Sequence, residues 1–390
     1  MLTVRGTDRT SARPVPEGTR LIPEEAGLIP EEAGLTALAG REALRAEEQR
    51  RLSPEVAAAI TAAGFPRHFV PDRWGGAAGQ FGPLVTGVAE VAETCGSAAW
   101  CAALFAAHGR LAAYLPAEGQ REVWERGPGA RIAAAVVPPQ GRAVAADGGW
   151  RLDGEWRPAS GVDHADWVLL ASWTPGGADR EHRIFAVPRS ELSVLDTWHT
   201  SGLRGTGSNT VVADGVRVPA HRSFTLDALL RPLPGAARCH TVPFPMVAAL
   251  VFAAPLLGIA RSALRTWTGE RAAVASPHPA TATVLSGASA RIHTAGLLLD
   301  GAATRADHGE ITPLAVAENR RDATTAAALC REAVDDLFRT SGSRAQSPDH
   351  PVQRAWRDAT AAAGHGTLDP DAAARAYAAA VLSPEPGGPR

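Results

Sequence analysis

The sequence contains no lysine, so all 39 of its basic residues are arginines. This absence excludes the enzyme classes that depend on a lysine amine, including P-loop nucleotide hydrolases, pyridoxal-phosphate enzymes, Ser-Lys hydrolases and protein kinases. The HExxH and GxSxG motifs of zinc peptidases and serine hydrolases are absent as well. Enzymes whose reactive centre is a bound organic cofactor, such as a flavin, need none of these groups and stay open.

Cysteine is scarce and scattered, with no CxxC pair and no Cys/His spacing typical of a metal site. The four cysteines are Cys95, Cys101, Cys239 and Cys330. The first two fall in one apolar helical stretch, where a buried, unreactive thiol is the usual state. We therefore expect neither a disulfide framework nor a metal centre.

Neither sign of charge is in excess, because 41 acidic residues oppose the 39 arginines and the net charge is −2. Such a balance gives no field that favours nucleic acid or an anionic membrane. No apolar run approaches the roughly 20 residues of a spanning helix, and the first 18 residues lack the apolar core of a signal peptide. We expect a cytoplasmic protein that binds neither nucleic acid nor membrane.

The organisation of the chain changes three times. Residues 1–34 are rich in proline, glycine and glutamate and contain a direct LIPEEAG duplication, which predicts a flexible leader. Residues 35–130 show apolar side chains at helical spacing and predict a helical domain. Residues 131–225 predict a β domain, and residues 226–390 return to alanine-rich helices. Helices, strands and then helices, without βαβ alternation, indicate an α+β fold and not a Rossmann or TIM architecture.

Alternation of apolar and polar residues identifies the strands of the β domain. The segment GRAVAADGGWRLDGEW predicts two strands joined by a turn at Asp147-Gly148-Gly149, with Trp150 and Trp156 on one face of the second strand. Further strands are predicted at RIAAAVVPP, DWVLLASW, RIFAVP and NTVVADGVRVP. In the first helical domain, Ser53 followed by Pro54 predicts a helix start with a serine cap.

Three motifs in the same order resemble the acyl-CoA dehydrogenase superfamily. They are the stretch LDTWHTSGLRGTGSNTVVADGVRVPAHR, the strand pair GGWRLDGEWRPASG and the helix HPVQRAWRDATAAAGH. The resemblance covers about residues 35–380. It implies an N-terminal helical domain, a central β-barrel or sandwich domain and a C-terminal four-helix bundle.

The superfamily contains two chemistries, and the fold alone does not separate them. The dehydrogenases need a glutamate base after the Arg-Asp pair of the last motif, but ungapped alignment from Arg357-Asp358 places Gly366 there. The adjacent His365 resembles the flavin hydroxylase branch. The resemblance thus implies the oxygenase component of a two-component flavin-dependent monooxygenase. An acyl-CoA or acyl-carrier-protein dehydrogenase with a displaced glutamate is the main alternative, and a flavin-free scaffold or cyclase is a third.

The hydroxylase resemblance also implies reactants and partners. The cofactor would be reduced FMN or reduced FAD, with O2 as co-substrate, supplied by a separate NAD(P)H-dependent flavin reductase. The substrate would be an aromatic, phenolic or related compound of secondary metabolism, such as antibiotic biosynthesis. The family habit and the alanine-rich C-terminal helices imply a homotetramer.

Cofactor-binding residues follow from the resemblance. Ser160 matches the serine that hydrogen-bonds flavin N5, with Gly161 beside it, and Trp100 matches a wall of the flavin pocket. The glycine-rich loop from Arg204 to Ser208, including Thr206, would lie beside the flavin. It precedes a strand, so it is not a dinucleotide fingerprint. Pro158 departs from the aromatic residue usual at its position. A structural interpretation stays open for each: a strand-ending turn, a core tryptophan and a corner loop.

Substrate-side residues are predicted on two helical segments. His108, eight residues after Trp100, matches a substrate-side base, although a lone histidine in an apolar helix is usually a packing residue. Asp358 and His365 are seven residues apart and are expected on one face of one helix, where both would contact substrate and His365 would act in catalysis. The alternative is a surface ion pair between Arg354 and Asp358. A hydroxyl often found in the family's first strand is absent from residues 133–136 (AAAV), which predicts a more apolar pocket.

Overall fold

The computed structural model describes residues 30–175, 180–272 and 279–382. Five N-terminal helices come first: α1 Pro30–Gln49, α2 Pro54–Ala62, α3 Phe81–Ala92, α4 Gly96–Ala112 and α5 Ala117–Trp124. The predicted cap of α2 is confirmed, because the Ser53 hydroxyl accepts a hydrogen bond from the Val56 N–H at 3.4 Å. Helix α1 begins at Pro30, inside the predicted leader, and residues 1–29 of that leader lie outside the described residues.

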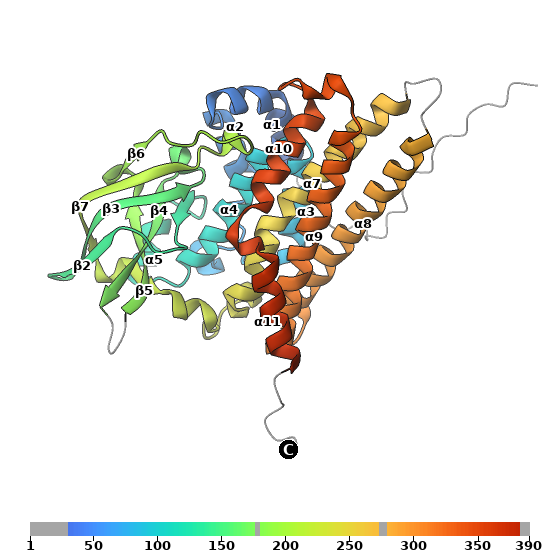
Figure 1. Cartoon of the computed structure of the whole chain (residues 1–390). Coiled ribbons are helices and arrows are strands. Elements are labelled where there is room, and N and C mark those ends of the chain that lie inside the picture. The colour runs from blue at the N-terminus through green and yellow to red at the C-terminus, as the bar shows by residue number, and fades with distance from the viewer. Residues whose placement is uncertain (1–29, 176–179, 273–278, 383–390) are drawn as a thin grey trace, which may run out of the picture.

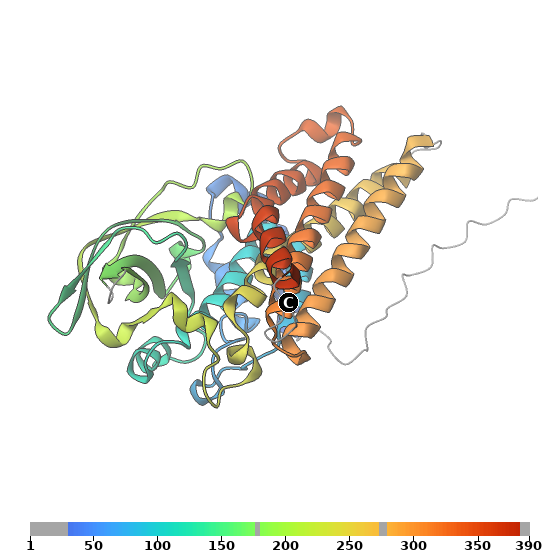
Figure 2. The same cartoon turned by 60° about the horizontal axis from the view of Figure 1, so that its bottom comes forward.

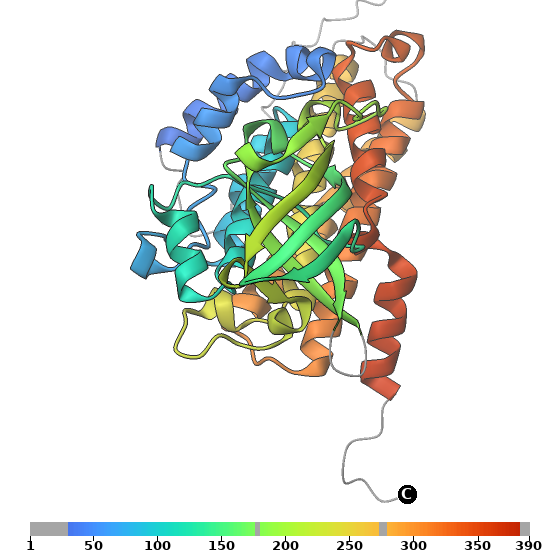
Figure 3. The same ribbon diagram turned by 90° about the vertical axis from the view of Figure 1, so that its left-hand side faces the viewer.

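Among the described residues, eight strands follow in two four-stranded sheets; Figure 3 shows the β region facing the viewer. They are β1 Ile132–Ala135, β2 Arg142–Ala146, β3 Gly149–Ala159, β4 Trp167–Pro175, β5 Arg180–Pro188, β6 Ser193–Leu195, β7 Asn209–Pro219 and β8 Ser223–Thr225. One sheet has the order β1-β4-β5-β8 and the other β2-β3-β7-β6, and every pairing is antiparallel except β1 with β4. The predicted hairpin of β2 and β3 is confirmed, and Leu152 and Trp156 are buried in the core of this region as the alternation predicts.

The C-terminal part is a bundle of long helices that lies beside the sheets (Figures 1 and 2). The helices are α6 Arg238–Thr241, α7 Phe244–Ala272, α8 Pro279–His308, α9 Pro313–Arg339, α10 Pro351–Ala363 and α11 Pro370–Leu382. The predicted α+β fold, with helices before and after a β region, is therefore confirmed.

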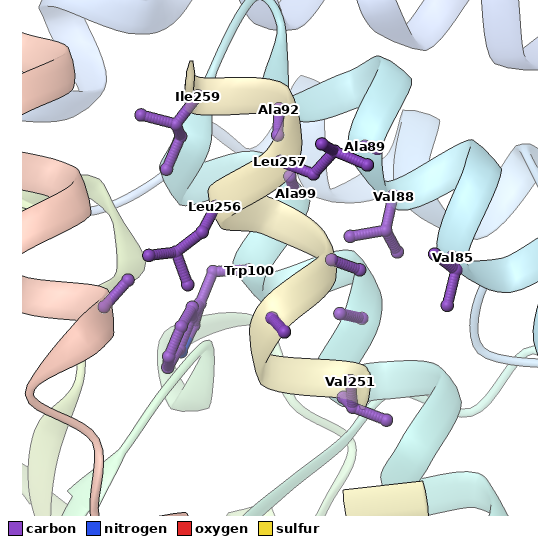
Figure 4. Packing of buried hydrophobic residues seen from close by; sticks show 14 of the residues in the cluster. Val85, Val88, Ala89, Ala92, Ala99, Trp100, Val251, Leu256, Leu257 and Ile259 are labelled. Atoms are coloured by element: carbon purple, nitrogen blue, oxygen red, sulfur yellow. The ribbon is translucent and has the colours of Figure 1, made fainter. Parts of the chain in front are cut away.

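Helix α7 forms the centre of the helical core. By length and composition it is apolar enough to cross a membrane, so the expectation that no apolar run approaches a spanning length is wrong; 78% of its most apolar window is buried inside the protein. Leu256 and Ile259 pack among residues of α3 and α4 (Figure 4). At Gly258 a Cβ atom would lie 1.9 Å from the Ala89 carbonyl oxygen, so the close approach of α7 to α3 requires glycine.

Helix α4 lies between the β region and the C-terminal helices (Figure 1). Nearly every residue from Gly96 to Ala112 is buried, which explains why the segment is apolar on all sides. One of its faces contacts β1 and another contacts α7. Side chains of α4 therefore reach the boundary between the two regions, and the candidate site lies at this boundary.

Candidate active site

A cavity of about 300 Å³ lies where α4, β1, the end of β3, the loop before β7 and α7 meet. Its volume is at the lower end of the range for small-molecule sites. The structure brings together six residues predicted from different parts of the sequence, all of which line the cavity. They are Trp100, His108, Ser160, Thr206, Ser208 and His365.

Ser160 lies directly after β3, where the chain turns at Gly161 with a φ of 72°. A Cβ atom on Gly161 would meet the Phe105 ring at 2.8 Å, so glycine permits both the turn and the packing. The Gly161 N–H donates to the Thr206 carbonyl oxygen at 2.8 Å, which ties this turn to the loop before β7. Gly161 thus positions Ser160 and does not itself line the cavity.

The Ser160 hydroxyl belongs to a buried group of polar side chains. Its Oγ lies 2.7 Å from the Ser208 Oγ and accepts a hydrogen bond from Trp100 Nε1 at 3.3 Å. Ser208 in turn lies 2.7 Å from the Thr206 hydroxyl. Four of the side chains that the resemblance assigned to the cofactor, those of Trp100, Ser160, Thr206 and Ser208, are therefore joined into one hydrogen-bonded set.

His108 is buried in α4, and its Nδ1 lies 2.7 Å from the Ile132 carbonyl oxygen in β1. A carbonyl oxygen only accepts, so Nδ1 carries the hydrogen and the neutral ring keeps its lone pair on Nε2. Burial lowers the pKa of His108 to about 4, and the bond to Ile132 raises it by less. The ring is neutral near pH 7, and its Nε2 lone pair is free to accept a hydrogen bond.

His365 shows the opposite arrangement of ring nitrogens. The Thr367 N–H donates to His365 Nδ1 at 3.2 Å, so the hydrogen of the neutral ring lies on Nε2. The ring stacks on Phe252 of α7 with centroids 3.8 Å apart and meets the edge of Trp100 at 5.9 Å. Burial lowers the pKa of His365 to about 4. His365 therefore offers a hydrogen-bond donor where His108 offers an acceptor.

The expectation that Asp358 and His365 share one helical face is wrong. Helix α10 ends at Ala363, and His365 caps a short 3-10 turn beyond it, so the seven-residue spacing does not run along one helix. Asp358 is buried, does not line the cavity, and accepts a hydrogen bond from the Leu203 N–H at 2.6 Å. Its predicted contact with substrate therefore has no support in this geometry, and the residue instead anchors the loop before β7.

The alternative surface pair of Arg354 and Asp358 is not formed among the described residues. Asp358 is instead enclosed, and burial raises its pKa to about 6. The neighbouring Arg357 pairs with Glu47 of α1 and donates to the Ser201 carbonyl oxygen at 2.7 Å. Arg357 and Asp358 thus hold the same loop from two sides.

Arg204 also stabilises the loop before β7 and does not contact the cavity. Its guanidinium donates to the Glu47 carbonyl oxygen at 3.2 Å and to the Thr200 carbonyl oxygen at 3.5 Å, and it does not line the cavity. The guanidinium is part of the contact between the loop and α1. The glycine-rich motif is therefore divided: Thr206 and Ser208 face the cavity, whereas Arg204 fastens the loop.

Several cavity residues were missed by the sequence analysis. Phe252 stacks on His365, yet it lies in a long apolar helix where no local signal separates it from core residues. Trp198 lies in the family stretch before β7 and lines the cavity. Its place there could not be predicted, because it depends on the conformation of the loop. Arg110 lines the cavity two residues after His108, and its buried guanidinium donates to the carbonyl oxygens of Cys239 and Val242.

The rest of the lining is apolar. Ala134 and Ala135 of β1 lie at the wall, in agreement with the apolar pocket predicted from this strand, and Pro158 lies there too. None of the described residues that line the cavity is an aspartate or a glutamate. The predicted burial of the Cys95 and Cys101 thiols is confirmed, and burial raises the pKa of both.

Comparison with known proteins agrees with this geometry. Residues 250–370 match the family described as acyl-CoA dehydrogenase, C-terminal domain. The flavin-dependent monooxygenase oxygenase subunit HsaA of Mycobacterium tuberculosis is 31% identical over 354 residues, which cover 85% of this chain and 88% of the relative. The chain belongs to the oxygenase components of flavin-dependent monooxygenases.

Two further similarities support this assignment. The oxygenase component of the FADH(2)-dependent resorcinol hydroxylase of Rhizobium sp. is 32% identical over 375 residues, covering 89% of this chain and 91% of the relative. The crystal structure of the M. tuberculosis HsaA monooxygenase superposes with a TM-score of 0.82 at 30% identity, covering 90% and 96% of the two chains. The predicted flavin monooxygenase function, the acyl-CoA-dehydrogenase-like fold and the use of a reduced flavin are therefore confirmed. As the oxygenase component of a two-component system, this monooxygenase works with a separate flavin reductase.

Proposed function

We propose that this monooxygenase hydroxylates a phenolic or related aromatic substrate, with reduced flavin at the Ser160 end of the cavity and substrate at the His108 end. The observation that carries the proposal is the pairing of an acceptor hydroxyl with a neutral imidazole in one apolar cavity. When bound, reduced flavin supplies the two electrons that let O2 place one oxygen atom on the substrate and release the other as water.

Ser160, Trp100, Thr206 and Ser208 fit the cofactor role. Ser160 presents a hydroxyl oxygen toward the cavity, Trp100 supplies an aromatic wall, and the two loop hydroxyls hold Ser160 in place. Either reduced FMN or reduced FAD, with O2 as co-substrate, is the proposed cofactor. The apolar wall from β1 and α7 keeps water from the ring and from the reacting atoms.

His108 is the proposed substrate-side base. Its Nε2 lone pair is fixed by the bond from Nδ1 to Ile132 and can accept the hydrogen of a phenol, although the burial that lowers its pKa to about 4 also weakens the ring as a base. A phenolate ring is more nucleophilic than a phenol, and general-base catalysis of this kind contributes about 10²–10⁴-fold. His365, held by Phe252 and Thr367, is the proposed donor of a hydrogen bond from Nε2 to the substrate or the cofactor.

The dehydrogenase alternative lacks its base in this cavity. Removal of a proton next to a thioester requires a carboxylate, and the described lining residues contain none. Gly366 stands at the position of the family glutamate, in the turn after α10. The cavity thus supports hydroxylation better than dehydrogenation.

The proposed assembly is a homotetramer packed through the C-terminal helices. Apolar side chains are exposed along α8, α9 and α11 in the single chain; among them are Leu285, Leu297, Leu314, Val381 and Leu382. Contacts between copies would bury them. Light scattering should give the mass of four chains, and a monomer at micromolar concentration would contradict the proposal. The proposed location is the cytoplasm, which suits the four unpaired cysteines.

The test of the function uses the purified chain with FMN or FAD kept reduced by an excess of any NAD(P)H-dependent flavin reductase. A panel of phenols in ¹⁸O2 should yield hydroxylated product that carries one ¹⁸O atom. Hydrogen peroxide without product across the whole panel would contradict the assignment to phenols. Bleaching of tightly bound oxidised flavin by an acyl thioester would support the dehydrogenase instead.

A further inference from the structure

Three hydroxyl groups that line the cavity form a hydrogen-bonded chain. Ser160 Oγ lies 2.7 Å from Ser208 Oγ, and Ser208 Oγ lies 2.7 Å from Thr206 Oγ1. The chain ends at the Leu203 carbonyl oxygen, 2.8 Å from Thr206 Oγ1. Ser208 and Thr206 are 3% and 2% exposed, so bulk water does not compete for their hydrogen bonds.

The carbonyl at the end of the chain sets the direction of every bond in it. A carbonyl oxygen only accepts, so the Thr206 hydroxyl must give its single hydrogen to Leu203. The Thr206 oxygen then accepts the hydrogen of Ser208, and the Ser208 oxygen accepts the hydrogen of Ser160. Any other arrangement leaves two oxygen lone pairs facing each other at hydrogen-bond distance.

Ser160 is therefore left without a hydrogen to offer. Its one hydrogen goes to Ser208, and one of its two lone pairs accepts from Trp100 Nε1 at 3.3 Å. The second lone pair is the part of the hydroxyl that is free for a ligand in the cavity. Ser160 is an acceptor toward the cavity, although an isolated serine serves equally well as donor or acceptor.

The Leu203 carbonyl is itself fixed by the loop. Leu203 has a φ of 50°, in the left-handed region that non-glycine residues rarely adopt, and its N–H donates to buried Asp358 at 2.6 Å. Its carbonyl oxygen also accepts from Trp198 Nε1 at 3.0 Å. These contacts hold the carbonyl toward Thr206, so the direction of the hydroxyl chain is built into the fold.

A hydroxyl that can only accept a hydrogen bond, as Ser160 does toward the cavity, distinguishes the two redox states of a flavin. Reduced flavin carries an N–H at N5, whereas oxidised flavin has a bare acceptor nitrogen there. An acceptor hydroxyl stabilises the first and repels the second. On the basis of the proposed function, we infer that Thr206 and Ser208 are positioning residues that orient Ser160 and thereby make the cavity select reduced flavin over oxidised flavin.

The test compares binding of oxidised and anaerobically reduced FMN and FAD to the full chain and to Thr206→Val. Valine keeps the shape of threonine but removes the hydroxyl, so Ser208 turns its hydrogen toward Ser160, and Ser160 turns its own into the cavity. The ratio of the Kd for oxidised flavin to the Kd for reduced flavin should fall about tenfold, which is the value of one neutral hydrogen bond. The midpoint potential of the bound flavin should then fall by about 30 mV.

Three further variants separate orientation from general damage. Ser208→Ala removes the hydroxyl between Thr206 and Ser160 and should also lower the ratio of the two Kd values. Thr206→Ser keeps a hydroxyl at this position and should give the wild-type ratio. Thr210→Val makes the same change on β7, where the Thr210 hydroxyl pairs with Thr197 outside the cavity, and should leave the ratio unchanged.

The outcomes distinguish the inference from the proposed function. If the wild-type chain binds neither redox form, the proposed flavin site is wrong and the inference falls with it. If the wild-type chain discriminates and both Thr206→Val and Ser208→Ala discriminate equally well, the flavin site stands and the orienting role is wrong. An equal loss of affinity for both redox forms would likewise show that the hydroxyls serve only packing.

Discussion

The two ends of the cavity are built differently. At the Ser160 end, polar side chains are joined to one another and to backbone groups, so that each hydrogen bond has one direction. At the His108 end, the walls are mainly alanine, valine and phenylalanine with the buried Arg110, whose guanidinium is bonded to backbone carbonyls, and His108 makes one described hydrogen bond, to Ile132. A fixed pattern of donors and acceptors suits a cofactor that never changes. An apolar space with one base suits a substrate that differs among relatives.

The largest effect is expected at the substrate end, for His108→Ala. Loss of the base should lower product formation by about 10²-fold or more, while binding of reduced flavin, which depends on the other end, should stay close to wild type. Uncoupling is the measurement: hydrogen peroxide should rise as product falls. His293→Ala, an exposed histidine on α8, is the matched control and should hydroxylate normally. Normal product yield in His108→Ala would make His108 a packing residue.

A smaller effect is expected at the cofactor end, for Ser160→Ala. The variant removes the acceptor, so reduced flavin should bind about tenfold more weakly and more O2 should leave as hydrogen peroxide. Titration with anaerobically reduced FMN and FAD measures the first effect, and a peroxide assay the second. Ser172→Ala is the control, because Ser172 is a buried serine of β4 that lies outside the cavity. Wild-type affinity in Ser160→Ala would remove Ser160 from the cofactor site.

The same contrast explains what sequence could and could not predict. The strands were predicted because apolar residues such as Leu152 and Trp156 alternate with polar ones. Successive side chains of a strand point to opposite faces of the sheet, so this alternation can be recognised in the sequence alone. Ser160, Thr206 and Ser208 were placed through the family resemblance that local motifs carry. The end of α10 was missed although Gly364, the residue at its C-cap, is of the type that commonly ends a helix. A left-handed leucine, or a phenylalanine that meets a histidine from another helix, arises only from long-range packing.

The last effect concerns pH and the stability of the fold, and it tests burial, not chemistry. Burial lowers the pKa of His108, His240 and His365 to about 4, so the folded chain keeps these rings neutral where the unfolded chain protonates them near pH 6.5. The free energy of unfolding should therefore fall as pH drops from 6.5 toward 4. Asp358 opposes this trend, because burial raises its pKa to about 6 and the folded chain takes up that proton first.

Burial also lowers the pKa of His68 and His182, so the histidines outweigh Asp358 and the net change between pH 7 and pH 4 should be a loss on the order of several kcal/mol. Urea unfolding at a series of pH values measures it. His240→Leu removes one buried ring that does not line the cavity and should flatten part of the curve. His293→Leu, on the exposed face of α8, should leave the curve unchanged. A flat wild-type profile over this range would mean that water reaches these rings, and it would undermine the neutral state on which the role of His108 as a base depends.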